Sequence, residues 1–368
     1  MLKTGNSTRR EFLAACSAGL LAGGPFAAAG EVQMPAVREF RRGGMVYRRL
    51  GQTGMDVSLL SFGSHTDPAD RLPAGEDKTV LTPQGQARRD RIIAHAFDLG
   101  VNLLDVYASE GQWEPAARLV RGRREKILIS LAHEITPKDI DQATRFFGYV
   151  DLYRFCAQEI DQATLENWDL LRKAKEAGMI RAIGISTHVE RTMTMALDEL
   201  EGLDYIIFPY NFVHARADYS QFLPLALRKG VGLIAMKPLA SGSIMKLDPR
   251  ARAGAKPEFD DLQLWQRENK LVLPAAVAEL TASLSRMPDE TLCMAAMRFV
   301  YSRPFLAAAV TGMFEDRLLD DNYKALTRYW EMRPEEQSAL GAAKRLASLW
   351  GTSWLRSDYR WLEERWLG

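Results

Sequence analysis

Short apolar runs alternate with longer amphipathic stretches along most of the chain. Eight runs have the length and aliphatic character of buried strands, at 57–62, 102–105, 126–131, 149–155, 180–185, 204–208, 232–236 and 307–310. The stretches between them repeat apolar positions at helical spacing, at 112–121, 138–147, 161–177, 189–199, 217–229, 287–302 and 315–328. Alternating strands and helices predict a parallel sheet with right-handed crossovers, and eight such units predict an α/β fold of the (β/α)8 TIM barrel type.

The end of the first strand argues against the other common α/β architecture, a doubly wound open sheet. Open sheets of that type usually bind a nucleotide through a GxGxxG motif after the first strand, whereas this strand ends in SFGSHTDP. In a barrel, functional residues lie after the carboxyl ends of the strands. The candidate residues are therefore those at strand ends and exits, namely Asp105, Glu110, His133, Cys156, Ser186, Asn211, Lys237 and Gly312.

Several segments stand outside the repeating pattern. A short hairpin is expected around Gly51–Gly54, after a loose linker at 31–44, and a Pro-, Asp- and Gly-containing region at 244–286 interrupts the seventh unit. The barrel is expected to span 45–330 and to be followed by a Trp-rich helical extension at 331–368. The tryptophans of this extension could pack on the barrel flank or form a lid on its mouth, and flank packing is the simpler interpretation.

The N-terminal residues have the pattern of an export signal. Arg9 and Arg10 precede a weakly apolar run, which ends in the small residues at 27–29. This order is typical of a twin-arginine signal peptide, so residues 1–30 are excluded from the fold. The run is too short and too rich in Gly and Ala for a stable membrane span. We expect the Tat translocase as a partner during export and a location that is periplasmic or otherwise outside the cytoplasm by the twin-arginine route.

Charge and cysteine content exclude several classes of function. The formal net charge is +1, and no basic stripe interleaves with aromatic residues, so nucleic-acid binding is not expected. Of the three cysteines, Cys16 lies in the signal, and Cys156 and Cys293 are too few for a disulfide framework. The five histidines are scattered without metal-ligand spacing, so no metal site is expected.

Seven motifs in order give the chain a resemblance to a known family. They are YRRLGQTGMDVSLLSFG, AFDLGVNLLDVYASEGQWE, YVDLYRF, KEAGMIRAIGISTH, PYNFVHAR, GVGLIAMKPLASG and AVTGMFEDRLLDDN. Together they resemble the aldo-keto reductase superfamily over roughly residues 45–330. The resemblance implies an NAD(P)-linked oxidoreductase that transfers hydride between a nicotinamide and a small-molecule carbonyl or sugar-like substrate.

The resemblance also implies a catalytic set of Asp, Tyr, Lys and His, of which this chain keeps one member. The aspartate is Asp105, whereas Glu110 stands at the tyrosine position. Ala132, followed by His133, stands at the lysine position, and Cys156 stands at the histidine position. The catalytic set is therefore degenerate, and an ordinary tyrosine–lysine proton donor is missing.

The cofactor positions implied by the resemblance are better preserved. Residues for the carboxamide, phosphate and adenine sides are Ser186, Thr187, Asn211, Lys237, Pro238, Leu239, Gly242, Gly312, Glu315 and Asn322. Glu315 stands where an NADP-using member would bind the 2′-phosphate. A carboxylate there would repel that phosphate and could accept a hydrogen bond from a ribose hydroxyl, so NAD is favoured over NADP.

Three hypotheses follow for the chemistry. In the first, the protein is an oxidoreductase whose proton donor is Tyr107, with His133 as the neighbouring charge, or Glu110, if burial keeps it protonated. In the second, it is a non-catalytic ligand-binding barrel, or pseudoenzyme, with or without a nucleotide. In the third, it is an isomerase or lyase on sugar-like substrates that uses Asp105, Glu110 and His133. In all three, Cys156 is interpreted as a small buried residue.

Overall fold

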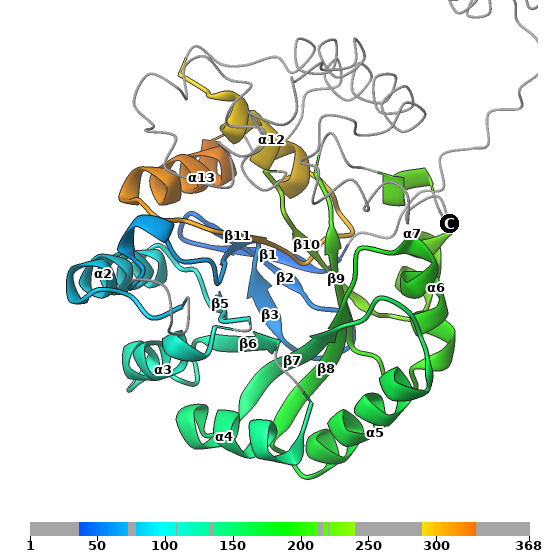
Figure 1. The fold of residues 1–368 in the computed structure, drawn as a ribbon. Helices are drawn as coiled ribbons and strands as arrows, with labels where there is room; N and C mark the ends of the chain where they lie inside the picture. The colour runs from blue at the N-terminus through cyan, green and yellow to red at the C-terminus, as the bar shows by residue number, and fades with distance from the viewer. Residues whose placement is uncertain are drawn as a thin grey trace, which may run out of the picture. The chain divides into compact units, whose positions relative to one another are not determined.

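The protein forms a closed barrel of eight parallel strands, as the strand and helix pattern predicts. The structure is a computed structural model that describes residues 37–72, 79–107, 109–132, 135–211, 216–219, 221–239 and 289–328. The barrel strands are β4 (Leu60–Phe62), β5 (Leu103–Asp105), β6 (Leu128–Ala132), β7 (Val150–Cys156), β8 (Ile180–Ser186), β9 (Tyr205–Pro209), β10 (Gly232–Met236) and β11 (Ala308–Thr311). Strand β11 pairs with β4 and closes the ring, so the (β/α)8 prediction is confirmed (Figure 1).

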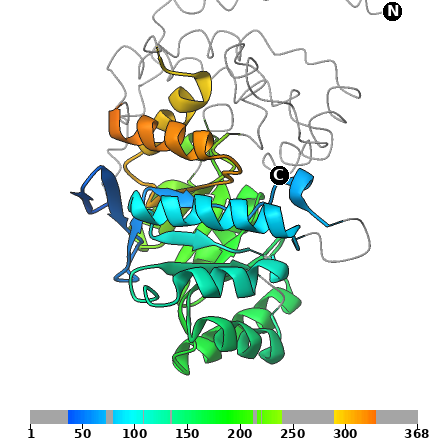
Figure 2. The ribbon, with the colours of Figure 1, turned by 90° about the vertical axis from the view of Figure 1, so that its left-hand side faces the viewer.

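Helices surround the strands on the outside of the ring (Figures 1 and 2). They are α2 (Pro83–Asp98), α3 (Trp113–Val120), α4 (Pro137–Phe147), α5 (Gln162–Glu176), α6 (Glu190–Glu199), α7 (Phe222–Arg228), α12 (Leu292–Tyr301) and α13 (Asp316–Arg328). Short 3-10 turns are η1 (Pro68–Asp70), η2 (Glu110–Gln112) and η3 (Arg216–Tyr219). Local sequence explains where these helices start: Thr136 and Asp139 form a capping box at the start of α4, and Thr82 caps α2.

A three-stranded antiparallel sheet precedes the barrel. It contains β1 (Glu39–Arg42), β2 (Met45–Arg49) and β3 (Asp56–Ser58), and the β2–β3 turn is the hairpin expected around Gly51–Gly54. Two expectations need correction. The first predicted strand is two strands, because Asp56–Ser58 pairs with β2 and only Leu60–Phe62 joins the barrel. The segment 31–44 is not wholly a linker, since β1 lies within it.

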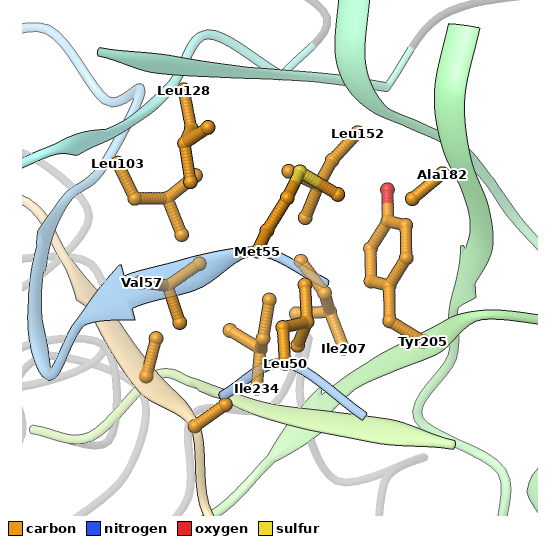
Figure 3. Close-up of a cluster of buried hydrophobic side chains, with 12 residues drawn as sticks. Leu50, Met55, Val57, Leu103, Leu128, Leu152, Ala182, Tyr205, Ile207 and Ile234 are labelled. Atoms are coloured by element: carbon orange, nitrogen blue, oxygen red, sulfur yellow. The ribbon is translucent and has the colours of Figure 1, made fainter. Parts of the chain in front are cut away.

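The hairpin closes the amino-terminal end of the barrel. Its apolar side chains Leu50, Met55 and Val57 are buried in one cluster with residues from the barrel interior (Figure 3). The amide N–H of Gln52 donates to the carbonyl of Gly230 at 3.0 Å, which fixes the turn just before β10. Because this end is sealed by apolar side chains, an active site is restricted to the carboxyl end of the strands.

Some predicted segments lie outside the described residues. They are the signal at 1–30, the interruption at 244–286 and the Trp-rich extension at 331–368. Within the described part of the chain, no helix combines the length and apolar character needed to cross a membrane. The same residues contain no group of three or more His, Cys, Asp or Glu side chains that could hold a metal ion.

Candidate active site

Strand register determines which side chains meet inside the carboxyl half of the barrel. Asp105 of β5 lies level with Ser130 of β6, and Arg154 of β7 lies level with Ala132 and with Gly184 of β8. Side chains alternate along a strand, and Leu103, Leu128, Leu152 and Ala182 belong to the interior cluster. The residues two positions further along each strand therefore also face inward, and these include Asp105, Ser130 and Arg154.

A buried ion pair between Asp105 and Arg154 is the main polar feature of the barrel interior. The two guanidinium nitrogens donate to the two carboxylate oxygens, Nη1 to Oδ1 at 2.8 Å and Nη2 to Oδ2 at 3.0 Å. The Ser130 hydroxyl lies 2.8 Å from Asp105 Oδ1 and 2.7 Å from Arg154 Nη1, so it bridges the pair. Asp105 is 4% and Arg154 2% exposed. This two-point geometry is the strongest form of a carboxylate–arginine contact.

The barrel interior keeps Arg154 charged. Burial lowers the pKa of its guanidinium, but Asp105, Tyr205 and Tyr107 together outweigh this effect, so the net pKa of Arg154 is raised. Tyr205 lies near the same cation; burial raises the pKa of the Tyr205 phenol, and Arg154 opposes that rise. The Tyr205 ring passes over Gly184, where a Cβ would come within 2.6 Å of a ring carbon. A glycine at this point of β8 therefore makes room for the aromatic ring beside the ion pair.

Tyr107 adjoins this pair from the loop after β5. Its backbone has φ of +42°, a left-handed conformation that is uncommon for a residue other than glycine. Its ring centroid lies 5.4 Å from the guanidinium carbon of Arg154, and the side chain is partly exposed. Strained backbone of this kind tends to occur at functional sites, because the surrounding structure must hold it in place. The structure thus brings a phenol and a permanent cation together beside the predicted aspartate.

The other predicted catalytic residues do not join this cluster. Glu110 is exposed at the start of η2, so the burial that would keep it protonated is absent. Cys156 is exposed at the end of β7, which makes its interpretation as a buried residue wrong, and its sulfur accepts a hydrogen bond from Gln158 Nε2 at 3.5 Å. His133 lies outside the described residues.

Arg154 is the site residue that sequence reasoning missed. A signal was present in VDLYRFC, where the arginine is in phase with the inward-facing Leu152 of an otherwise buried strand. A charged residue is almost never fully buried unless it has a partner, so its position alone predicts a partner across the barrel. The resemblance directed attention to position 132, whereas the cation of this site comes from the next strand.

The predicted cofactor residues gather along the ends of β8 to β10. Ser186 and Thr187 are buried at the end of β8, and the Ser186 hydroxyl makes a long 3.5 Å contact with the carbonyl of Phe155. Asn211 Nδ2 donates to the carbonyl of Lys237 at 3.0 Å. The arrangement leaves hydroxyl and amide groups at the same rim as the ion pair.

Lys237 has an unusual backbone conformation at this rim. Its φ is +55°, and its Nζ lies 2.9 Å from His188 Nε2. The two residues after it, Pro238 and Leu239, are described, and Pro238 is buried; Gly242 lies outside the described residues. The strained turn therefore presents a lysine amine beside an imidazole at the end of β10.

The remaining predicted cofactor residues lie after β11. Gly312 directly follows the strand, and Glu315 is exposed immediately before α13. Asn322 is buried within α13, where its backbone carbonyl accepts a hydrogen bond from the Tyr301 hydroxyl at 3.4 Å. Gly312 and Glu315 are thus placed at the carboxyl rim, whereas Asn322 is packed inside the helical layer.

Known proteins share both this sequence pattern and this fold. A sequence model of the aldo/keto reductase family matches residues 78–343. A probable voltage-gated potassium channel subunit beta from Arabidopsis thaliana is 26% identical over 315 residues, with 77% of this chain and 91% of that protein covered. An L-galactose dehydrogenase from the same plant is 24% identical over 315 residues, with 79% and 91% covered.

Solved structures have the same architecture. One is an aldo/keto reductase from Klebsiella pneumoniae in complex with NADP and acetate, with 17% identity and a TM-score of 0.56, covering 80% of this chain and 93% of that chain. At this identity the likeness concerns the fold alone. The family match extends over most of the chain and includes seven of the eight barrel strands, so the chain belongs to the aldo/keto reductase family.

Proposed function

We propose that this protein is a nicotinamide-dependent oxidoreductase that interconverts a small carbonyl compound and its alcohol, with Tyr107 as the proton donor. The observation that carries the proposal is the contact between the Tyr107 ring and the guanidinium of Arg154, which Asp105 holds by two hydrogen bonds. Family membership supplies the reaction class, and this contact places a cation beside the phenol that would donate the proton.

A phenol needs a nearby cation to act as a proton donor at neutral pH. Reduction of a carbonyl leaves a developing alkoxide that must receive a proton, and an ordinary phenol holds its proton until a pH of about 10. A positive charge nearby favours the phenolate and so eases proton release. Arg154 supplies a charge that does not titrate in a protein, so it stabilises the phenolate without passing on a proton itself. Asp105 keeps that charge in place.

The residues at the rim fit a nicotinamide dinucleotide. Among the described residues, the Ser186 hydroxyl makes only a long contact, so it retains capacity to bind a carboxamide. Asn211 follows β9, the neighbouring strand, at the same rim. Lys237 supplies positive charge for a phosphate. When bound, the nicotinamide donates or accepts the hydride. Exposed Glu315 would repel a 2′-phosphate, which favours NAD over NADP.

Cofactor binding and turnover test this function directly. Purified protein should bind NADH more tightly than NADPH in a fluorescence titration, and it should turn over members of an aldehyde and sugar panel. Tyr107→Phe should lower kcat by about 100-fold or more, because it removes the proton donor but keeps the ring. The matched control is Glu110→Gln, a neighbouring carboxylate on η2, which should retain the rate.

Other results would favour other functions. Bound nucleotide without turnover on any panel member would indicate a ligand-binding barrel. Nucleotide-independent conversion of a sugar-like substrate would indicate an isomerase or lyase. Equal rates for Tyr107→Phe and the wild type would remove Tyr107 from the chemistry while leaving the oxidoreductase assignment intact.

We also propose that the protein is exported to the periplasm by the Tat translocase. The support is the sequence pattern of residues 1–30, with paired arginines ahead of a weakly apolar run and a small-residue exit. Replacement of Arg9 and Arg10 by lysine should leave the protein in the cytoplasm. Cell fractionation measures the outcome, and periplasmic accumulation of the variant would contradict this route.

A further inference from the structure

The loop after β4 carries a histidine to the rim at which the ion pair lies. Gly63, Ser64 and His65 follow the strand, and the Cβ of His65 lies 3.7 Å from where a Cβ on Gly312 would stand. His65 is thus placed between the ends of β4 and β11, and β4 is the neighbour of β5, the strand that carries Asp105. The residue keeps exposed surface at this rim, so a ligand can reach it.

Arg89 fixes the backbone of this loop from α2. Its Nη1 donates to the carbonyl of His65 at 2.9 Å, and its Nη2 donates to the carbonyl of Ser64 at 3.1 Å. The guanidinium carbon lies 5.4 Å from the centroid of the Phe62 ring. Arg89 is 7% exposed, and burial lowers the pKa of its guanidinium to about 10, with Asp90 opposing.

Holding this loop with a buried arginine costs stability. Among the described residues, no carboxylate forms an ion pair with Arg89, and its Nε has no hydrogen-bond partner. A buried charge without a counterion is expensive, and an apolar side chain would fill the same space without that cost. The two hydrogen bonds that Arg89 donates fix the carbonyls of Ser64 and His65 relative to the barrel.

Charged groups from several elements act on the His65 imidazole. Partial burial lowers its pKa, and Lys237 at the end of β10 lowers it further. Asp105 at the end of β5 raises it, whereas Arg71 after η1 and Arg89 of α2 lower it. The net pKa of His65 is lowered, so the ring is neutral at neutral pH and can donate an N–H hydrogen bond without carrying charge.

We propose that His65 donates a hydrogen bond to the carbonyl oxygen of the substrate, and that Arg89 is the positioning residue that holds His65 at the rim. The assignment rests on the proposed oxidoreductase function. In this role His65 is a second hydrogen-bond donor, beside Tyr107, to the substrate oxygen on which negative charge develops. It also supplies an imidazole to a site in which Cys156 stands where the family resemblance predicts histidine.

Paired variants of His65 separate hydrogen bonding from packing. His65→Phe keeps a planar ring without a donor and should lower kcat/KM for 4-nitrobenzaldehyde reduction by NADH about 100-fold. His65→Gln retains an N–H donor and should recover part of that loss. The control is His95→Gln on α2, whose imidazole lies 3.9–4.0 Å from Asp316 and Asp320 on the outer surface, and which should keep the wild-type rate.

The pH profile shows whether the imidazole itself is involved. Donation by the neutral ring requires that kcat/KM falls as pH drops through the His65 pKa, which lies below the ordinary value of about 6.5. His65→Gln should lack this acid limb. Arg89→Lys keeps a positive charge but loses the pair of hydrogen bonds to the carbonyls of Ser64 and His65. It should lower kcat about 10-fold with little change in the affinity for NADH.

Histidine NMR supplies a readout that does not depend on turnover. The His65 resonance, identified by its loss in His65→Gln, should titrate below the usual range and shift when 4-nitrobenzaldehyde is added to the NAD⁺ complex; the His95 resonance should not shift. A wild-type rate in His65→Phe, or an unchanged acid limb in His65→Gln, would overturn the assignment. If Tyr107→Phe is inactive while His65→Phe is active, only the role of His65 is refuted, whereas an inactive wild type refutes the proposed function as well.

Discussion

The two ends of the barrel differ in the side chains that fill the interior: apolar side chains at the amino-terminal end and a buried ion pair at the carboxyl end. At the amino-terminal end, Leu50, Met55 and Val57 of the hairpin bury apolar surface against the interior residues. The turn glycine Gly51 packs against the backbone of Gly232, the first residue of β10. At the carboxyl end, the interior contains the buried ion pair of Asp105 and Arg154. The first arrangement contributes stability through burial, whereas the second places charge where water is excluded.

This difference shows where the fold tolerates unfavourable structure. Both described non-glycine residues with positive φ, Tyr107 and Lys237, lie at the carboxyl end, one beside Arg154 and the other beside His188. The amino-terminal turn uses glycine wherever φ is positive, at Gly51 and Gly54. Among the described residues, left-handed backbone at non-glycine positions therefore lies at the end that carries the candidate site. Buried charge is present at both ends, since Arg48 of the hairpin pairs with Glu39 and Asp151 at the start of β7 pairs with Arg124.

Breaking the ion pair from one side is the largest change that we predict. Asp105→Ala should lower the free energy of unfolding by about 3–5 kcal/mol, because Arg154 would be left buried without its carboxylate. Denaturant unfolding measures the effect. The double variant Asp105→Leu with Arg154→Met should be clearly less destabilised than the sum of the single variants, and strict additivity would contradict coupling across the barrel.

Truncation at the opposite end should affect stability alone. Leu50→Ala should lower the free energy of unfolding by about 3 kcal/mol, because Leu50 is fully buried and its side chain packs on Gly232. The affinity for NADH and the rate of turnover of the folded protein should not change. Leu50→Met, which conserves volume, should cost less than about 1.5 kcal/mol. A loss of cofactor affinity in Leu50→Ala would show that the two ends are not independent.

Relief of backbone strain at Lys237 should give the smallest change in the free energy of unfolding. It should also separate that change from the change in NADH binding. Asparagine tolerates the left-handed conformation better than lysine, so Lys237→Asn should raise the free energy of unfolding by about 0.5–1 kcal/mol while it weakens NADH binding. Lys237→Gln removes the same charge but does not relieve the strain of the left-handed backbone at this position. It should therefore weaken binding without a gain in stability, and equal stability of the two variants would indicate that strain at this position is negligible.

Local pattern predicted the ring of strands and much less of the site. All eight predicted barrel strands are present, because buried parallel strands and amphipathic helices have distinct periodicities. Strand β1 was missed because three of its four residues are exposed and its pairing with β2 is a tertiary contact. The division of the first strand at Leu59 was also missed, since one continuous apolar run contributes to two sheets.

The site depends on contacts between strands that are not neighbours in the sequence. Asp105 was predicted from its motif, but its partner Arg154 is 49 residues away on β7. The buried position of Arg154 in its strand indicates a partner, but nothing local identifies Asp105 as that partner. The exposure of Cys156 was missed for a similar reason, because it depends on where β7 ends relative to the rim and not on residue type.

The hold of Arg89 on the loop at 64–65 has a consequence for how this protein can change. Arg89 binds main-chain oxygens, so any amino acid can replace the histidine at 65 without loss of the anchor. A single substitution at position 65 can therefore change the side chain presented at this rim of the barrel while the backbone of the loop stays in place. A library randomised at this codon should yield folded proteins throughout, with altered preference among substrates.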